Sequence, residues 1–181
     1  PATRLAELLR HPALPPQRDD LSVELATLLH HTGQPHLALD LILARQFQPW
    51  AGGEGLVLAQ FVRAGILLAQ AALAANNPAQ ARELLTAALH PPHSLGESNH
   101  LLANQSEPLY WLGVATAPDN HPTEANAIWQ RGSRTSTDFQ QMAVAEVSPN
   151  PFWVASCLQA LGNHEDANAL FLKIQAFALA L

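Results

Sequence analysis

Cysteine and lysine are nearly absent from this 181-residue chain, and charged residues of either sign are scarce. Cys157 is the only cysteine, so an intramolecular disulfide is excluded and the redox compartment stays undetermined. Lys173 is the only lysine, and the arginines are spread along the chain rather than clustered. With a formal net charge of −6, the sequence lacks the basic face that nucleic-acid binding requires. We therefore expect no nucleic-acid partner.

Long apolar runs and the motifs of known catalytic sites are also missing. The longest apolar stretch, Ile66 to Ala75, is interrupted by Gln70 and is too short to cross a bilayer. Because no secretory signal is visible, we expect a cytoplasmic protein with no membrane partner. The chain begins without methionine, and we expect it to be part of a longer protein. The sequence contains no phosphate loop, zinc-protease motif, serine elbow or paired redox cysteines.

Histidine is more frequent than cysteine, but its spacing does not predict a metal site. His90, His93 and His100 share one segment, in which two prolines stiffen the chain and no cysteine is present. A zinc site needs three or four ligands in a defined geometry. We therefore expect neither a metal nor another cofactor. Cys157 lies among aliphatic residues of a predicted helix, which indicates a buried, inert thiol rather than a nucleophile.

The residues that are abundant indicate an all-α protein with an internal repeat. Alanine and leucine dominate, and no segment alternates in polarity as a strand would. A proline precedes an alanine by three residues at three places, and a histidine replaces the proline at a fourth: Pro35/Ala38, Pro78/Ala81, Pro122/Ala125 and His164/Ala167. The steps between these alanines are 43, 44 and 42 residues, a period typical of helical-repeat arrays.

Further positions recur at fixed offsets from these four alanines. A small residue stands twelve positions earlier: Ala26, Ala69, Gly113 and Ala155. A large apolar residue stands four positions later: Ile42, Leu85, Trp129 and Phe171. Five positions earlier stand residue types that tolerate a left-handed backbone at a helix C-terminus: Gly33, Asn76, Asn120 and Gly162. Each unit is therefore predicted to be a helix, a tight turn and a second helix packed closely on the first.

These patterns predict a single helical domain over residues 1–181. An N-terminal helix and a proline-rich connector occupy 1–19, and the repeats occupy 20–181. Helices are expected over 3–10, 21–31, 35–45, 55–75, 78–89, 106–116 and 122–130, from 150, and from 164 to the C-terminus. Asp19 or Asp20 is predicted to cap the second of these helices, and Ser106 to cap the sixth. A further short helix is expected over 138–144.

The predicted unit resembles the tetratricopeptide repeat (TPR), a helix–turn–helix of 34 residues with small residues where the helices cross. The nearest matches are Tyr110-Trp111-Leu112-Gly113 with Ala125 and Trp129, and Ala160-Leu161-Gly162-Asn163 with Ala167 and Phe171. The period here is longer by eight to ten residues, and the surplus falls in three segments between units: 46–55, 90–108 and 131–151. The resemblance implies an α-solenoid of about four TPR-like units with inter-repeat insertions.

The insertions are similar to those of one TPR segment in particular. It lies toward the C-terminus of large bacterial proteins that carry an upstream β-rich domain of unknown function, related to carbohydrate-active folds. The similarity rests on Pro49-Trp50, Gly52-Gly53-Glu54-Gly55, Leu95-Gly96-Glu97 and Asp138-Phe139-Gln140. In that family glutamate often follows the tryptophan, where this chain has Ala51. The similarity implies an accessory helical domain with no established catalytic residue.

The insertions supply the candidate partner-binding residues, which are Trp50, Glu54, Glu97, His100 and Phe139. In one interpretation these side chains form a polar–aromatic groove, because insertions in helical-repeat proteins often shape the binding surface. In the other, the aromatic residues pack the insertions down and the glutamates cap nearby helix N-termini. Neither carboxylate has an evident nucleophile or metal partner in the sequence.

Two functional hypotheses follow. The first is a non-catalytic binding or scaffold module that holds a protein, a peptide or another domain of the same chain. The second is a ligand or substrate site within a carbohydrate-acting protein, with Glu54 and Glu97 as acid–base or sugar-binding groups. The apolar final stretch, 171–181, lacks the polar face of a terminal repeat. We expect it to dock on its own repeat or to be covered by another segment or a second copy, as in a homo-oligomer.

Overall fold

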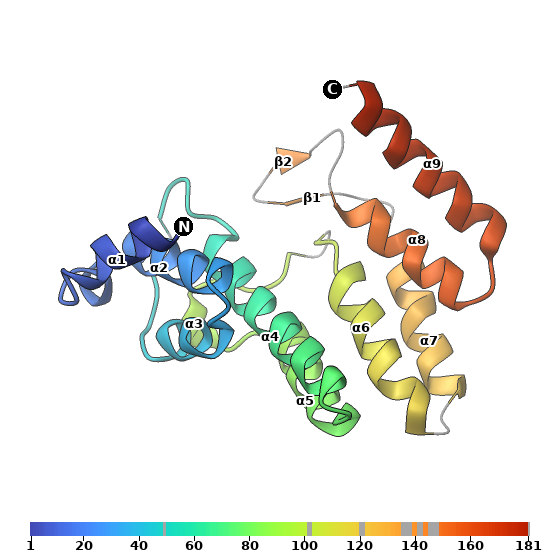
Figure 1. Cartoon of the computed structure of the whole chain (residues 1–181), viewed down its shortest axis with the longest axis horizontal. Helices are drawn as coiled ribbons and strands as arrows, with labels where there is room; N and C mark the ends of the chain where they lie inside the picture. The colour runs from blue at the N-terminus through green and yellow to red at the C-terminus, as the bar shows by residue number, and fades with distance from the viewer. Residues whose placement is uncertain are drawn as a thin grey trace.

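The computed structural model describes residues 1–48, 50–100, 103–119, 122–134, 139–140, 143–144 and 149–180, which form a helical domain (Figure 1). Its α-helices are α1 (Ala2–Leu9), α2 (Asp19–His31), α3 (Pro35–Leu43), α4 (Leu56–Ala74), α5 (Pro78–Leu89), α6 (Ser106–Thr116), α7 (Pro122–Ser133), α8 (Asn150–Ala160) and α9 (His164–Ala180). Three short 3-10 turns, η1 (Pro15–Gln17), η2 (His93–Leu95) and η3 (Ala117–Asp119), and a small hairpin of β1 (Phe139–Gln140) and β2 (Ala143–Val144) lie between them. The all-α class is confirmed, and each expected long helix is present.

Local rules account for most helix ends. The first residue of α3, α5 and α7 is a proline, at the position where its missing N–H has no partner to lose: Pro35, Pro78 and Pro122. The turns before α3, α5 and α9 contain the expected left-handed residues: Gly33, Asn76 and Gly162. The fourth such position, Asn120, lies outside the described residues. Asn77 adds a side-chain cap to α5, accepting a hydrogen bond from the Gln80 N–H at 3.2 Å.

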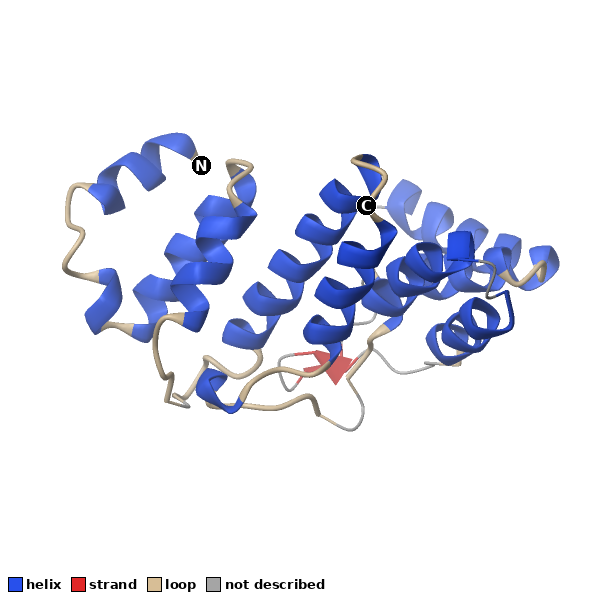
Figure 2. Cartoon of the chain, turned by 90° about the horizontal axis from the view of Figure 1, so that it is seen from below, coloured by secondary structure: helices blue, strands red, loops and turns tan. Residues whose placement is uncertain are grey.

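Consecutive helices pack against one another along the chain. The helices pair as α2/α3, α4/α5, α6/α7 and α8/α9. Neighbouring pairs are in contact through α3 and α4, α5 and α6, and α7 and α8. In addition, α4 contacts α2, α6 contacts α4, and α8 contacts α6, so the first helices form a continuous row (Figure 1). The described parts of the connections from α3 to α4 and from α5 to α6 lie along one edge of the row of helices, and the β1–β2 hairpin lies along the same edge (Figure 2).

Small residues sit where the paired helices come closest. Five alanines of the two small-residue positions are fully buried: Ala26, Ala38, Ala69, Ala81 and Ala155. Gly113 of α6 lies under the ring of Trp129 on α7, and a Cβ atom there would be only 2.2 Å from Trp129 Nε1. That indole N–H donates to the Tyr110 carbonyl at 3.1 Å. Glycine is therefore required at this position by close approach rather than by backbone conformation.

Aromatic side chains join the last helices of the domain. Tyr110 and Trp111 of α6 contact Trp153 of α8, with ring centroids 5.5 and 5.9 Å away. Phe152 of α8 in turn lies 5.6 Å from Phe171 of α9. Aromatic pairs at these distances stabilise a protein beyond the area they bury. The contact between α6 and α8 is therefore held by ring packing as well as by aliphatic burial.

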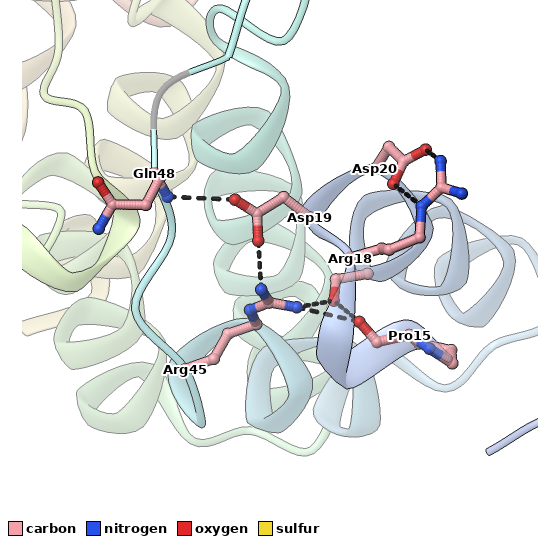
Figure 3. A network of polar contacts seen from close by, with 7 residues as sticks. Pro15, Arg18, Asp19, Asp20, Arg45 and Gln48 are labelled. Atoms are coloured by element: carbon pink, nitrogen blue, oxygen red, sulfur yellow. Dashed lines mark hydrogen bonds and ion pairs between the residues drawn. The ribbon is translucent and has the colours of Figure 1, made fainter. Parts of the chain in front are cut away.

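A polar network fastens the N-terminal connector to the first helix pair (Figure 3). The Arg45 guanidinium donates to the Pro15 carbonyl at 3.0 Å and to Ser22 Oγ at 2.8 Å, and it forms an ion pair with Asp19. The second carboxylate oxygen of Asp19 accepts the N–H of Gln48 at 3.1 Å. One arginine thus ties the connector, the start of α2 and the first insertion together.

Three local predictions are wrong. Within the described chain neither Asp19 nor Asp20 caps α2 through its side chain, because Asp19 pairs with Arg45 and Asp20 pairs with Arg18. Ser106 is a helical residue of α6 rather than its cap, and its hydroxyl donates to the Gly132 carbonyl at 2.8 Å.

The third wrong prediction is the helix expected over 138–144. The described part of this segment is extended instead, with Phe139 opposite Val144 and Gln140 opposite Ala143 in an antiparallel pair. Antiparallel pairing supplies backbone partners that a helix this short would leave unsatisfied at both ends.

Among the described helices, only α4 is long and apolar enough to cross a membrane by the criteria of length and composition. It contacts α2, α3, α5 and α6, which cover it on several sides. A core helix of a water-soluble domain meets the same criteria. In α4, 39% of the apolar window is buried inside the described structure, so these contacts account for part of its apolar character.

Candidate functional site

A groove of about 640 Å³ lies on the face formed by the first helices of successive pairs. It is lined by the end of the first insertion, one side of α4, the end of α5, the second insertion, the start of α6 and the first residue of α8. Leu58, Val62 and Ile66 of α4 form its apolar floor, because residues four apart share one helix face. A second depression is lined only by residues of α5 and His90, so that surface belongs to a single helix.

Glu97 of the second insertion caps α4. Its Oε2 accepts the N–H of Gly55 at 2.7 Å, and its Oε1 accepts the N–H of Leu58 at 3.1 Å. Both are among the N–H groups that the start of a helix leaves without an intrahelical partner, and a carboxylate there also interacts favourably with the helix dipole. For Glu97, the interpretation as a helix cap is confirmed.

The two insertions pack together to place this carboxylate. The N–H of Phe47 donates to the Ser94 carbonyl at 2.8 Å, and Phe47 and Leu95 are both buried. Gly96 adopts the left-handed conformation, with φ 73°, and a Cβ atom there would lie 2.7 Å from the Phe47 carbonyl oxygen. Glycine at position 96 therefore allows the close approach that brings Glu97 to the start of α4.

Glu54 lines the groove but does not cap the helix that it precedes. The side chain is exposed, and within the described structure it has no hydrogen-bond or ion-pair partner. The expectation that Glu54 caps α4 is wrong, because Glu97 accepts the helix N–H groups from across the groove. His100 also lines the groove. The structure therefore brings Glu54, Glu97 and His100 together.

The two aromatic candidates are placed differently. Trp50 is not among the groove-lining residues; it packs against the core that contains Phe47 and covers Gly53. A Cβ atom at Gly53 would lie 2.0 Å from Trp50 Cε2, so glycine is needed beneath the indole ring. Phe139 belongs to β1, and its side chain lies outside the described residues.

Sequence reasoning missed one pair of groove residues, Arg63 on α4 and Glu107 on α6. Arg63 Nη1 lies 3.3 Å from Glu107 Oε1, and the Glu107 side chain is only 23% exposed. Burial raises the pKa of Glu107, and the charge of Arg63 opposes this shift. The two residues are 44 positions apart, one repeat period, and this spacing is the signal that could have revealed them.

Titratable groups elsewhere are consistent with structural roles. Cys157 is buried beside Gly132 and the Ser106 carbonyl, and burial raises the pKa of its thiol to about 12. The predicted burial of this cysteine is confirmed, and its raised pKa favours the unreactive thiol form. In the described part of the chain, no three His, Cys, Asp or Glu residues are grouped so that they could hold a metal ion.

No protein-family model matches this chain, and no solved structure matches it. The fold and the groove therefore carry the functional argument.

Proposed function

We propose that this chain is a non-catalytic binding or scaffold module. Its partner in this proposal is a protein, a peptide or another domain of the same chain, held by an α-solenoid of about four TPR-like units. The proposal extends the observed helix packing to a repeat architecture and assigns the groove beside α4 as the binding surface.

The repeat architecture is supported by packing at equivalent positions. The positions that recur in sequence, such as Ala38, Ala81 and Ala167, are buried on the second helix of their pairs. The first helices of neighbouring pairs contact one another in order along the chain. Stacked units of this kind bury a continuous core and create an extended surface on one side.

The observation that carries the binding proposal is the groove itself. It crosses from α4 to the start of α8, so residues of three helix pairs and two insertions contribute to a single surface. The groove combines an apolar floor on α4 with many polar and charged side chains, so it can both bury apolar groups of a ligand and orient its polar ones.

The enzymatic alternative is not favoured by a specific contact. Both oxygens of Glu97 accept hydrogen bonds from α4, so that carboxylate acts on the helix rather than on a ligand. If Glu97 took up a proton as a base, it would lose the charge that strengthens both of these hydrogen bonds and favours its place at the helix start. We therefore do not propose Glu54 and Glu97 as a catalytic pair.

A pair of matched variants tests the proposal. Ala59 is exposed in the groove, and Ala79 is exposed on the far side of the α4/α5 pair. We expect Ala59→Trp to fill the groove and abolish capture of a partner from lysate, as read by mass spectrometry. Ala79→Trp adds the same bulk elsewhere and should leave capture unchanged. Equal capture by both variants would locate binding on another surface.

A further inference from the structure

The length and floor of the groove define the kind of chain it can hold. Leu58 and Ile66 are eight residues apart on α4, so the apolar floor is about 12 Å long. An extended peptide rises about 3.3 Å per residue, so roughly four residues span this floor. Alternate side chains of such a peptide would face the half-buried Leu58 and Val62, which suit aliphatic groups, whereas Ile66 is only 1% exposed and closes the end of the floor.

The charges that line the groove are unbalanced. Three carboxylates, those of Glu54, Glu97 and Glu107, face one guanidinium, that of Arg63. The N-terminus of α4 partly compensates the charge of Glu97 through the two hydrogen bonds described above. Arg63 compensates Glu107 through one long contact, and Glu54 has no partner in the described structure, so the groove keeps an excess of negative charge. The net charge of −6 would also steer a basic partner toward the protein.

Glu107 is the carboxylate with most to gain from a ligand. Its bond to Arg63 is 3.3 Å long, whereas charge-assisted N–H···O bonds are usually about 2.7–2.9 Å. In the described structure this contact engages only Oε1. A carboxylate removed from water gains stability from each added donor, because burial otherwise disfavours its charge. The raised pKa of Glu107 is consistent with this incomplete compensation.

We propose that the groove binds an extended peptide segment in which a lysine or arginine accompanies aliphatic side chains, and that Glu107 accepts hydrogen bonds from this cation. The inference rests on the proposed binding function and adds the chemistry of the partner. The aliphatic side chains pack on the floor formed by α4, and the cation lies between α4 and α6, where it adds donors that Arg63 does not supply.

A random heptapeptide display library, panned on the immobilised full chain, tests both levels of the proposal. We expect the wild type to enrich peptides that combine Lys or Arg with Leu, Ile or Val. Glu107→Gln should keep the aliphatic enrichment and lose the basic one. Glu83→Gln is the matched control, because Glu83 is an exposed glutamate on the other face of α5 and should select as the wild type does.

Affinity measurements complete the test. For a selected peptide labelled with fluorescein, Glu107→Gln should weaken binding about tenfold, the effect of losing one charge-assisted hydrogen bond. Replacing the peptide's lysine by glutamine should weaken binding to the wild type by a similar factor. This second comparison uses only the wild-type protein, so misfolding of a variant cannot affect it.

The possible failures are distinguishable. Selected peptides without an excess of Lys or Arg, or basic enrichment that survives Glu107→Gln, would overturn the assignment of a cationic partner. The binding function would stand in that case if Ala59→Trp abolished selection. Absence of any enriched peptide, or unchanged selection by Ala59→Trp, would overturn the proposed function itself.

Discussion

Replacement of Glu97 by alanine should destabilise the whole domain, although Glu97 belongs to an insertion. Its two hydrogen bonds join the second insertion to the start of α4, 42 and 39 residues away in sequence. Helix α4 contacts four other helices, so fraying of its first turn would loosen the centre of the array.

The magnitude follows from the geometry of the cap. Loss of an N-cap side chain costs about 0.5–2 kcal/mol, and Glu97 satisfies two N–H groups with a charged acceptor, so we expect about 2 kcal/mol for Glu97→Ala. For a chain of this size the melting temperature should fall by about 4–8 °C. Glu97→Gln keeps one oxygen acceptor and loses the charge, so it should cost about 1 kcal/mol.

Urea unfolding followed by far-UV circular dichroism measures these differences, with the m-value as a check that the native state remains compact. Glu54→Ala is the matched control, because Glu54 is an exposed glutamate beside the same helix start and should change the free energy of unfolding by less than about 0.5 kcal/mol. The reasoning would be refuted if Glu54→Ala cost as much as Glu97→Ala. A neutral Glu97→Ala would also refute it and would leave that carboxylate free for a ligand.

Three further predictions concern other parts of the chain. Burial lowers the pKa of His30, whose Nε2 lies 3.2 Å from the Gln60 carbonyl, so the folded state disfavours its protonation. The free energy of unfolding should therefore fall as the pH drops from 6.5 toward the lowered pKa of His30 in the folded protein. In urea titrations at a series of pH values, His30→Gln should remove this part of the pH dependence. A variant with the same pH dependence as the wild type would contradict the role given to His30. Cys157 should resist Ellman's reagent in the native protein and react fully in denaturant, whereas rapid native labelling would show that its site opens. Leu172 and Leu179 on α9 are 63% and 81% exposed, so we expect the chain to self-associate through this face. Sedimentation velocity should show association that depends on concentration and that the double variant Leu172→Glu, Leu179→Glu abolishes. A wild-type chain that is monomeric at every concentration would exclude this face as a homo-oligomer contact.

Much of the fold could be predicted because its determinants are local. A proline at a first helical position and a left-handed residue in the preceding turn mark a helix start wherever they occur, as at Pro78 and Asn76. Buried small residues at a fixed period likewise marked the helix crossings. The prediction failed at Asp19, whose carboxylate pairs with Arg45 instead of capping the helix. It also failed within 138–144, where the described residues 139–140 and 143–144 pair as strands.

The candidate site was predicted less completely. The insertions were identified as its source, and three of the five chosen residues line the groove or its rim. Trp50 was chosen for its type, but its ring covers Gly53 and packs on the core. Arg63 and Glu107 were overlooked because they lie on separate predicted helices, and no residue near either one in the sequence indicates that the two side chains meet.

The sequence by itself determined the helices and the short turns that pair them, because helix propensity, proline and glycine act within a few residues. Only the tertiary structure decided that Glu97, rather than Glu54, caps α4, and that Arg63 meets Glu107. Those contacts depend on how an insertion folds back and how neighbouring pairs are stacked. Their energies come from groups about forty residues apart, whose distance is settled only when the whole array is packed.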